Sequence, residues 1–209
     1  MKVLVLFECS RATASEFERL GHEAWSCDLK PSEIYSDFHH QGDVWEMLLN
    51  GRWDLVIMHP PCTYLSVSGI HWNNRGRGWE NTDAAISLVR SLMEYCEGNG
   101  IPYCLENPVS IISTRIRKPD QIIQPYYFGD DASKKTCLWL YKLPPIAIPP
   151  REQWVPPRIV NGKERWANQT DSGQNRLGPS KDRATNRART YPGIAKAFAK
   201  TWGKFQNIP

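Results

Sequence analysis

The chain has 209 residues and a formal net charge of +4, a length that suits one substantial domain with a continuous core. No stretch approaches the roughly 18 consecutive apolar residues of a transmembrane helix, so we expect no membrane span. The six cysteines form no CxxC pair and no zinc-ligand spacing, which predicts reduced thiols and no metal site. The apolar run at residues 2–8 is too short for a signal peptide, and we expect a cytoplasmic protein.

Positive charge is concentrated in one part of the sequence. Residues 145–190 contain nine Lys or Arg and four Asp or Glu, a net charge of +5, which leaves −1 for the rest of a chain whose total is +4. Such a concentration is typical of a protein with an anionic partner such as nucleic acid. The alternative is a solvated loop without a partner, and charge alone does not separate the two.

The first 29 residues predict a strand, a helix and a second strand. Residues 2–8 are an apolar run of strand type. The next segment carries Ala14, Phe17 and Leu20 at helical spacing and ends at Gly21. Residues 22–29 then read as a second strand. A β-α-β unit of this kind predicts parallel strands.

The alternation of strands and helices continues along the chain. We expect a short helix at residues 42–51, a strand at 53–59, an amphipathic helix at 82–100, and strands at 101–107 and 135–143. Thr82 and Asp83 supply a start for the long helix, and the sequence GNG ends it. The predicted fold class is α/β, a mostly parallel twisted sheet with helices on both faces.

Three parts follow from this pattern. Residues 1–144 form the core. Residues 145–190 show no periodicity and predict long loops or a small irregular subdomain. Residues 191–209 restore helical spacing, with Pro192 suited to a first turn, and we expect a closing helix that packs back on the core.

Polar side chains follow the predicted strands, where ligands of open α/β sheets lie. These residues are Glu8, Cys9, Ser10, Asp28, His59, Cys62, Glu106 and Asn107. A carboxylate that ends the second strand, here Asp28, is where a ribose is usually held in nucleoside-cofactor folds. Asp43, at the next strand-to-helix position, is placed to accept a hydrogen bond from an adenine amino group.

Several motifs resemble those of the DNA cytosine-5 methyltransferases. PPC at residues 60–62 and EN at 106–107 are similar to motifs IV and VI of that family, and PPCTYLS keeps the serine of PPCQxFS as Ser66. GD at residues 42–43, YFGDDASKKTCLWL at 127–140 and YPGIAKAFAKTW at 191–202 resemble motifs III, VIII and X. Asp28 ends the strand that carries motif II.

The resemblance implies a Rossmann-like S-adenosylmethionine-dependent methyltransferase fold and methyl transfer to C5 of cytosine in DNA. Cys62 would be the nucleophile that adds to C6 of a cytosine flipped into the site. Glu106, as a protonated acid, would contact the pyrimidine N3 and amino group. Lys134, at the first arginine position of motif VIII, would approach the base carbonyl or a phosphate, and Asn107 would hold the Cys62 loop.

The remaining site residues implied by the resemblance fall into two groups. Those for the cofactor are Phe7, Glu8, Cys9, Ser10, Asp28, Leu29, Asp43 and Pro60. Those for DNA are Ser66, Arg75, Arg77, Arg183 and Arg187. The loop at residues 66–81 also contains glycines and two tryptophans, so we expect it to close over the flipped base, with arginines on phosphates and a tryptophan in the vacated stack.

The chain departs from the family in two respects. Residues 7–17 contain no glycine where motif I is glycine-rich, and only residues 145–190 stand where a larger target-recognition domain belongs. A member this compact resembles the small methyltransferases of bacteriophages, for which protection of DNA against restriction is the expected role. The pair His59 and Cys62 replaces the polar and aromatic residues of the [DNS]PP[YF] motif, which argues against amino methylation.

Two alternatives stay open from the sequence. The first is a pyrimidine-modifying enzyme that uses Cys62 and Glu106 on free nucleotides or with another donor. The second is a non-catalytic DNA-binding or anti-restriction protein that retains the fold, and the missing glycines of motif I favour it.

Overall fold

The computed structural model describes residues 1–178 and 189–204 and has a seven-stranded mixed sheet at its centre, in the order β3-β2-β1-β4-β5-β7-β6. The strands are β1 (Lys2–Leu6), β2 (Glu23–Asp28), β3 (His39–Gln41), β4 (Leu55–Met58), β5 (Tyr103–Pro108), β6 (Gln121–Ile123) and β7 (Thr136–Tyr141). β1 to β5 run parallel, whereas β7 is antiparallel to both of its neighbours. The order equals the doubly wound order 3-2-1-4-5-6 with one antiparallel strand inserted near an edge.

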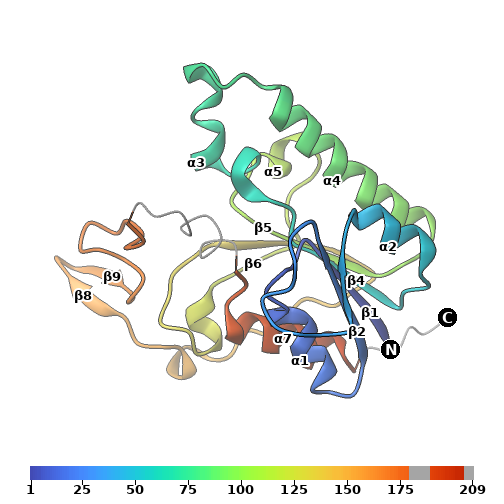
Figure 1. Ribbon diagram of the computed structural model, residues 1–209. Helices are drawn as coiled ribbons and strands as arrows, with labels where there is room; N and C mark the ends of the chain where they lie inside the picture. The colour runs from blue at the N-terminus through green and yellow to red at the C-terminus, as the bar shows by residue number, and fades with distance from the viewer. Residues whose placement is uncertain (179–188, 205–209) are drawn as a thin grey trace.

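Helices cover both faces of the sheet (Figure 1). The longer ones are α1 (Ala12–Glu18), α2 (Val44–Asn50), α4 (Glu80–Gly98) and α7 (Pro192–Trp202). The short ones are α3 (Val67–Ile70), α5 (Ile112–Arg115), η1 (Cys62–Tyr64), η2 (Asn73–Arg75), η3 (Pro125–Phe128) and η4 (Arg151–Gln153). The structure thus confirms the α/β class, the mostly parallel sheet and the closing helix. In the described part of the chain, no helix is long and apolar enough to cross a bilayer.

Alternation along β1 builds the two cores. Leu4 and Leu6 point to the face covered by α2 and α4, where they join a cluster of buried side chains. Val3 and Val5 point to the opposite face and pack in a second cluster with α1 and α7. Because successive residues of a strand face opposite sides, a run of apolar residues such as 2–6 fits a strand covered on both faces.

The basic segment is more ordered than the sequence predicts. Within residues 145–178, β8 (Arg158–Val160) and β9 (Lys163–Arg165) form an antiparallel hairpin. Trp166 stacks on Tyr126 of η3 with ring centroids 3.9 Å apart, and Trp154 packs on Tyr127 at 4.4 Å. Residues 145–178 thus contain one short hairpin within otherwise irregular chain, and four aromatic rings anchor this part to the core.

The start of the long helix also differs from the prediction. α4 begins at Glu80 rather than at Thr82 and Asp83. The Thr82 hydroxyl accepts from Asn73 at 2.8 Å and donates to the carbonyl of Tyr64 at 2.9 Å. Thr82 is thus used to hold the preceding loop against the helix instead of capping it.

Gly193 allows the closest approach of α7 to the core. A Cβ at this position would lie 2.2 Å from the carbonyl oxygen of Phe128, so Gly193→Ala requires a backbone shift. We expect a loss of about 1–3 kcal/mol in the free energy of unfolding, measured by urea denaturation. Gly98→Ala is the matched control, since a Cβ there meets nothing within 4 Å. Equal stability of the two variants would contradict this account of α7 packing.

Candidate functional site

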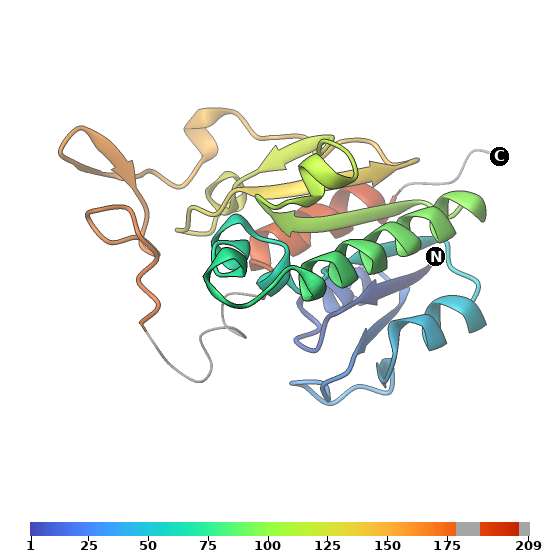
Figure 2. The ribbon, with the colours of Figure 1, turned by 90° about the horizontal axis from the view of Figure 1, so that it is seen from above.

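The order of the strands reverses between β1 and β4, and the candidate site lies at the carboxyl ends of these strands. Leu6 is in register with Met58 of β4, and Met58 with Leu105 of β5. Because the strands are parallel, the residues that follow these positions lie at one edge of the sheet. The α3 segment and the β8–β9 hairpin extend on the same side of the molecule (Figures 1 and 2).

Glu106 is a buried carboxylate at this edge. It is 6% exposed, and its Oε2 lies 2.9 Å from Nδ1 of His59, the residue that follows β4. Its Oε1 is buried and has no hydrogen-bond partner among the described residues. A buried carboxylate oxygen without a partner is costly, which makes this atom a candidate contact for a ligand.

The charge on Glu106 differs from the sequence-based expectation. Burial by itself raises the pKa of Glu106, but the positive charge of Lys134 and the contact with His59 outweigh it, so the net pKa is below the ordinary value of 4.5. This direction favours an ionised carboxylate at neutral pH in the free protein. Lys134 lies on the segment before β7, and its positive charge lowers the pKa of Glu106.

Asn107 fastens the loop that carries Cys62. The side chain is 1% exposed, and its Nδ2 donates to the carbonyl of Pro60 at 2.8 Å. Cys62 opens η1, is half-buried, and its carbonyl accepts from the amide of Ser66 at 2.8 Å. The sequence placed Asn107 in this role, and the contact has the geometry that the role needs.

A backbone bridge ties the other end of the Cys62 loop to the chain after β5. Ser66 pairs with Ser110, and the amide of Ile111 donates to Leu65 at 2.9 Å. Ser66 is 8% exposed, and its hydroxyl accepts from the amide of Gly69, so it caps α3 from within the fold. It does not present its hydroxyl as an exposed DNA contact.

The loop after α3 exposes arginines beside aromatic rings. Arg75 lies over Trp72 at 5.9 Å and Arg77 over Tyr64 at 5.4 Å, and Trp72 is 52% exposed. Stacked guanidinium groups and an exposed indole fit contact with phosphates and bases. Arg183 and Arg187, the other arginines expected at DNA, lie outside the described residues.

The loop after β1 is closed by Glu8. Its carboxylate is 4% exposed and accepts from the amides of Thr13 at 2.7 Å and Ala14 at 3.1 Å, at the first turn of α1. Ser10 accepts in the same way from Ala12 at 3.3 Å. The amides that bind a pyrophosphate in dinucleotide folds are therefore occupied by a side chain of the protein itself.

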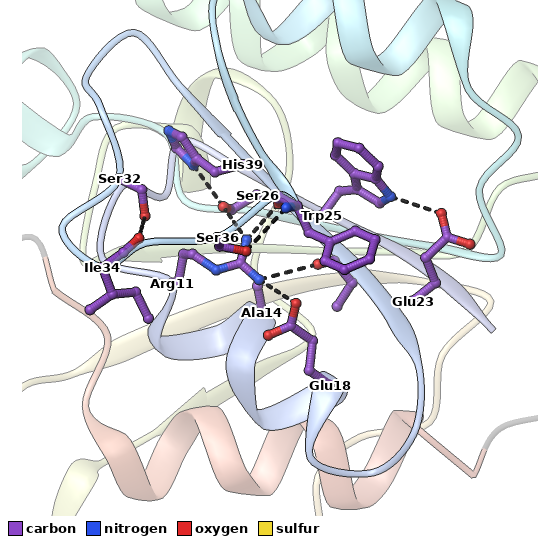
Figure 3. Close-up of polar contacts among 12 residues, drawn as sticks. Arg11, Ala14, Glu18, Glu23, Trp25, Ser26, Ser32, Ile34, Ser36 and His39 are labelled. Carbon is purple, nitrogen blue, oxygen red and sulfur yellow. Dashed lines mark hydrogen bonds and ion pairs between the residues drawn. The ribbon is translucent and has the colours of Figure 1, made fainter.

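Two residues of this loop adopt the left-handed backbone conformation that glycine favours. They are Phe7, with φ of 62°, and Arg11, with φ of 58°. The Arg11 side chain is 1% exposed and runs back along β2, where it donates to Ser26 at 3.0 Å and pairs with Glu18 (Figure 3). The loop thus has a glycine-like backbone without a glycine, and Arg11 points away from the carboxyl end of β2.

The carboxyl end of β2 presents the expected nucleoside-facing groups. The carboxylate of Asp28 accepts from the amide of Lys30 at 2.9 Å, and Leu29 is 76% exposed. Asp43 caps α2 through a 2.9 Å bond from the amide of Trp45 and is exposed at the neighbouring strand end. Two carboxylates with an uncovered apolar side chain between them suit an aminated base and its ribose.

Other expected residues have simpler placements. Cys9 follows Glu8 and is half-buried, and burial together with the charges of Asp28 and Glu33 raises the pKa of its thiol. Pro60 is buried below the Cys62 loop. All six cysteines are free thiols. Within residues 1–178 and 189–204, no group of three or more His, Cys, Asp or Glu could hold a metal ion.

Neither a comparison with protein-family models nor one with curated proteins finds a match for this chain. The motifs and the geometry of the site therefore carry the functional assignment.

Sequence reasoning missed Thr13 and assigned no role in the site to His59. Thr13 donates its amide to Glu8, and its hydroxyl lies 3.3 Å from Nε2 of His59. The sequence places His59 among the polar residues at the strand ends and otherwise uses it only as evidence against amino methylation. A signal was present, since a histidine directly after a buried strand and directly before two prolines has a fixed direction at the ligand edge of the sheet.

The Asn107 contact can be tested by an isosteric change. Asn107→Asp replaces the donor with an oxygen that faces the carbonyl of Pro60, and we expect a loss of about 1–3 kcal/mol in the free energy of unfolding. Asn99→Asp is a matched control, because the exposed Asn99 makes a similar 2.8 Å bond to the carbonyl of Tyr95. Its expected loss is within about 0.5 kcal/mol in denaturant titration. Similar losses for both variants would show that Asn107 does not anchor the loop.

Proposed function

We propose that the protein is an S-adenosylmethionine-dependent methyltransferase that modifies C5 of cytosine in DNA. The main support is the geometry around Cys62 and Glu106. Asn107 fastens the PPC loop, and the neighbouring residue Glu106 is a buried carboxylate with one oxygen that has no hydrogen-bond partner among the described residues. The sheet, with its ligand edge at the reversal of strand order, is compatible with the Rossmann-like fold that the motifs imply.

The proposed chemistry assigns a role to each group of the chain. Cytosine C5 is a weak nucleophile, so the Cys62 thiolate adds to C6 and the electron pair of the C5–C6 bond moves toward C5. The electron-rich C5 would then take the methyl group from the sulfonium of S-adenosylmethionine, whose carbon–sulfur bond breaks to leave S-adenosylhomocysteine. Loss of the C5 proton to water and elimination of the Cys62 thiolate would restore the ring. The open Oε1 of Glu106 accepts from the exocyclic amino group, and proton uptake by this carboxylate accompanies contact with N3.

The cofactor side favours a nucleoside without phosphates. Asp28 would hold the ribose, Asp43 would accept from the adenine amino group, and the exposed side chain of Leu29 would contact the ring. Because Glu8 already occupies the first turn of α1, a dinucleotide pyrophosphate lacks its usual anion site. S-adenosylmethionine has no phosphate and supplies the methyl group.

Two surfaces fit DNA in this proposal. The exposed loop after α3 carries Trp72, Arg75 and Arg77, and the basic segment 145–190 carries a net charge of +5. Phosphate contacts of this kind give affinity with little sequence information, which suits a compact enzyme with a loose target. Protection of phage DNA against restriction is part of the proposal as the biological role.

A second candidate is a DNA-binding protein that retains the fold without methyl transfer. The glycine-free loop after β1 favours it. Binding of the methyl donor separates the two candidates, since only the first requires it.

Cys62→Ser should abolish methyl transfer and leave the fold intact, because the thiolate is the nucleophile. Wild-type protein with S-adenosylmethionine should be trapped covalently on DNA that contains 5-fluorocytosine, detected by intact-mass analysis. Cys96→Ser is the control, since Cys96 is a free thiol near the end of α4 and belongs to neither expected site, and it should still be trapped. A wild-type protein that forms no adduct, or an adduct on Cys62→Ser, would sink the proposed mechanism.

Calorimetric titration should detect binding of S-adenosylmethionine and of its demethylated product. Asp28→Ala should weaken this binding about tenfold or more, because a charge-assisted hydrogen bond to the ribose is lost. Asp83→Ala removes an exposed carboxylate of α4 and should leave binding unchanged. No heat at millimolar ligand for the wild-type protein would favour the second candidate.

A further inference from the structure

A continuous hydrogen-bonded chain crosses the site beneath the Cys62 loop. The amide of Thr13 donates to Glu8 at 2.7 Å, the hydroxyl of Thr13 lies 3.3 Å from Nε2 of His59, and Nδ1 of His59 lies 2.9 Å from Oε2 of Glu106. All four side chains are at most 8% exposed. The chain joins the ends of β1, β4 and β5, so it connects the expected cofactor side to the expected base side.

Three elements contribute groups next to His59. α1 contributes Thr13, β5 contributes Glu106, and α7 contributes Phe198, whose ring lies nearly parallel to the imidazole at a centroid distance of 6.5 Å. A side chain fixed by two hydrogen bonds and by packing loses its rotational freedom when the protein folds. Its two ring nitrogens therefore have defined directions in the folded state.

The charge of Glu106 fixes the proton on His59. An ionised carboxylate only accepts hydrogen bonds, so Nδ1 must carry the hydrogen that Oε2 accepts. In the neutral ring, Nε2 is then an acceptor, and the Thr13 hydroxyl donates to it. Hydrogen bonds thus run from Thr13 to His59 to Glu106, and every donor has an acceptor.

The bond to His59 also gives the two carboxylate oxygens of Glu106 different environments. Oε2 is engaged, whereas Oε1 is buried without a partner in the described part of the chain. Rotation of the carboxylate would exchange the two oxygens, and the imidazole opposes it. The other ionisable groups whose charges act together with that of Glu106 are Lys134, Cys104 and Cys137.

We propose that His59, supported by Thr13, is a positioning residue that holds Glu106 by one oxygen and directs the other toward the pyrimidine. This role rests on the proposed function of Glu106. His59 does not contact the base in this proposal. It sets the orientation of the carboxylate that does, and it stabilises the ionised form that accepts from an amino group.

The decisive experiment is a long-range proton–nitrogen NMR spectrum of the histidine rings in the folded wild-type protein near pH 7. The His59 signals are assigned by their loss in His59→Asn. We expect hydrogen on Nδ1, either alone or together with Nε2. A neutral ring with hydrogen on Nε2 only would overturn the proposal, because Nδ1 would then face the carboxylate without a hydrogen.

Two variants separate positioning from packing. His59→Phe keeps a ring against Phe198 but removes the donor, whereas His59→Asn keeps a donor near the place of Nδ1. In the Phe variant, the carboxyl carbon of Glu106 should titrate about one pH unit higher than in the wild type. The Asn variant should recover at least part of that shift. Equal midpoints in the wild type and the Phe variant would count against the proposal.

Methyl transfer supplies a separate readout. His59→Phe should lower kcat about tenfold or more, with the KM for DNA changed by less than about threefold, and His59→Asn should recover part of kcat. If wild-type protein forms no adduct with fluorocytosine DNA but Nδ1 carries hydrogen, the proposed function fails and the His59–Glu106 pair stands. If the adduct forms and Nδ1 carries no hydrogen, only the role of His59 fails.

Discussion

The buried negative charge of Glu106 is the constraint on which the arrangement of the site depends. A carboxylate that is 6% exposed stays ionised only if positive charge and hydrogen-bond donors surround it. His59, directly after β4, supplies a hydrogen bond, and the segment before β7 supplies the positive charge of Lys134. The residues that follow His59 are also held, because the side chain of Asn107 donates to the carbonyl of Pro60. The contacts that compensate the charge of Glu106 therefore lie next to the loop that carries Cys62 and help to hold it.

The loop after β1 has left-handed backbone at residues that rarely adopt it. Glycine commonly supplies left-handed backbone at such loops, but here Phe7 and Arg11 adopt it. For a residue with a Cβ this conformation is strained, so the surrounding contacts must stabilise it. Arg11 does so with a buried guanidinium group that joins α1 to β2, and Glu8 does so by capping α1. The absence of glycine therefore does not by itself obstruct this edge of the sheet.

The sequence predicts those parts of the fold that are determined locally. Apolar runs such as residues 53–59 identify the central strands, and helical spacing identifies α4 and α7. β3, β6 and the β8–β9 hairpin were missed because each strand has three residues and depends on pairing with distant chain. The same limit applies to the site. Cys62 and Glu106 stand out by motif, whereas the contact of His59 with Glu106 spans 47 positions and the ionisation of Glu106 depends on Lys134.

The two halves of the site differ in how their polar atoms are satisfied. Glu8 and Ser10, after β1, are bonded to amides of α1. At the carboxyl end of β5 and just after it, by contrast, Glu106 Oε1, Asn107 Oδ1 and Ser110 Oγ are buried without partners among the described residues. Buried polar atoms in folded proteins nearly always have partners, so three such atoms within five residues indicate a place completed by a ligand or by water. They lie beside the Cys62 loop, since Asn107 bonds the carbonyl of Pro60 and Ser110 pairs with Ser66, so a ligand with both donors and acceptors would supply the missing hydrogen bonds there.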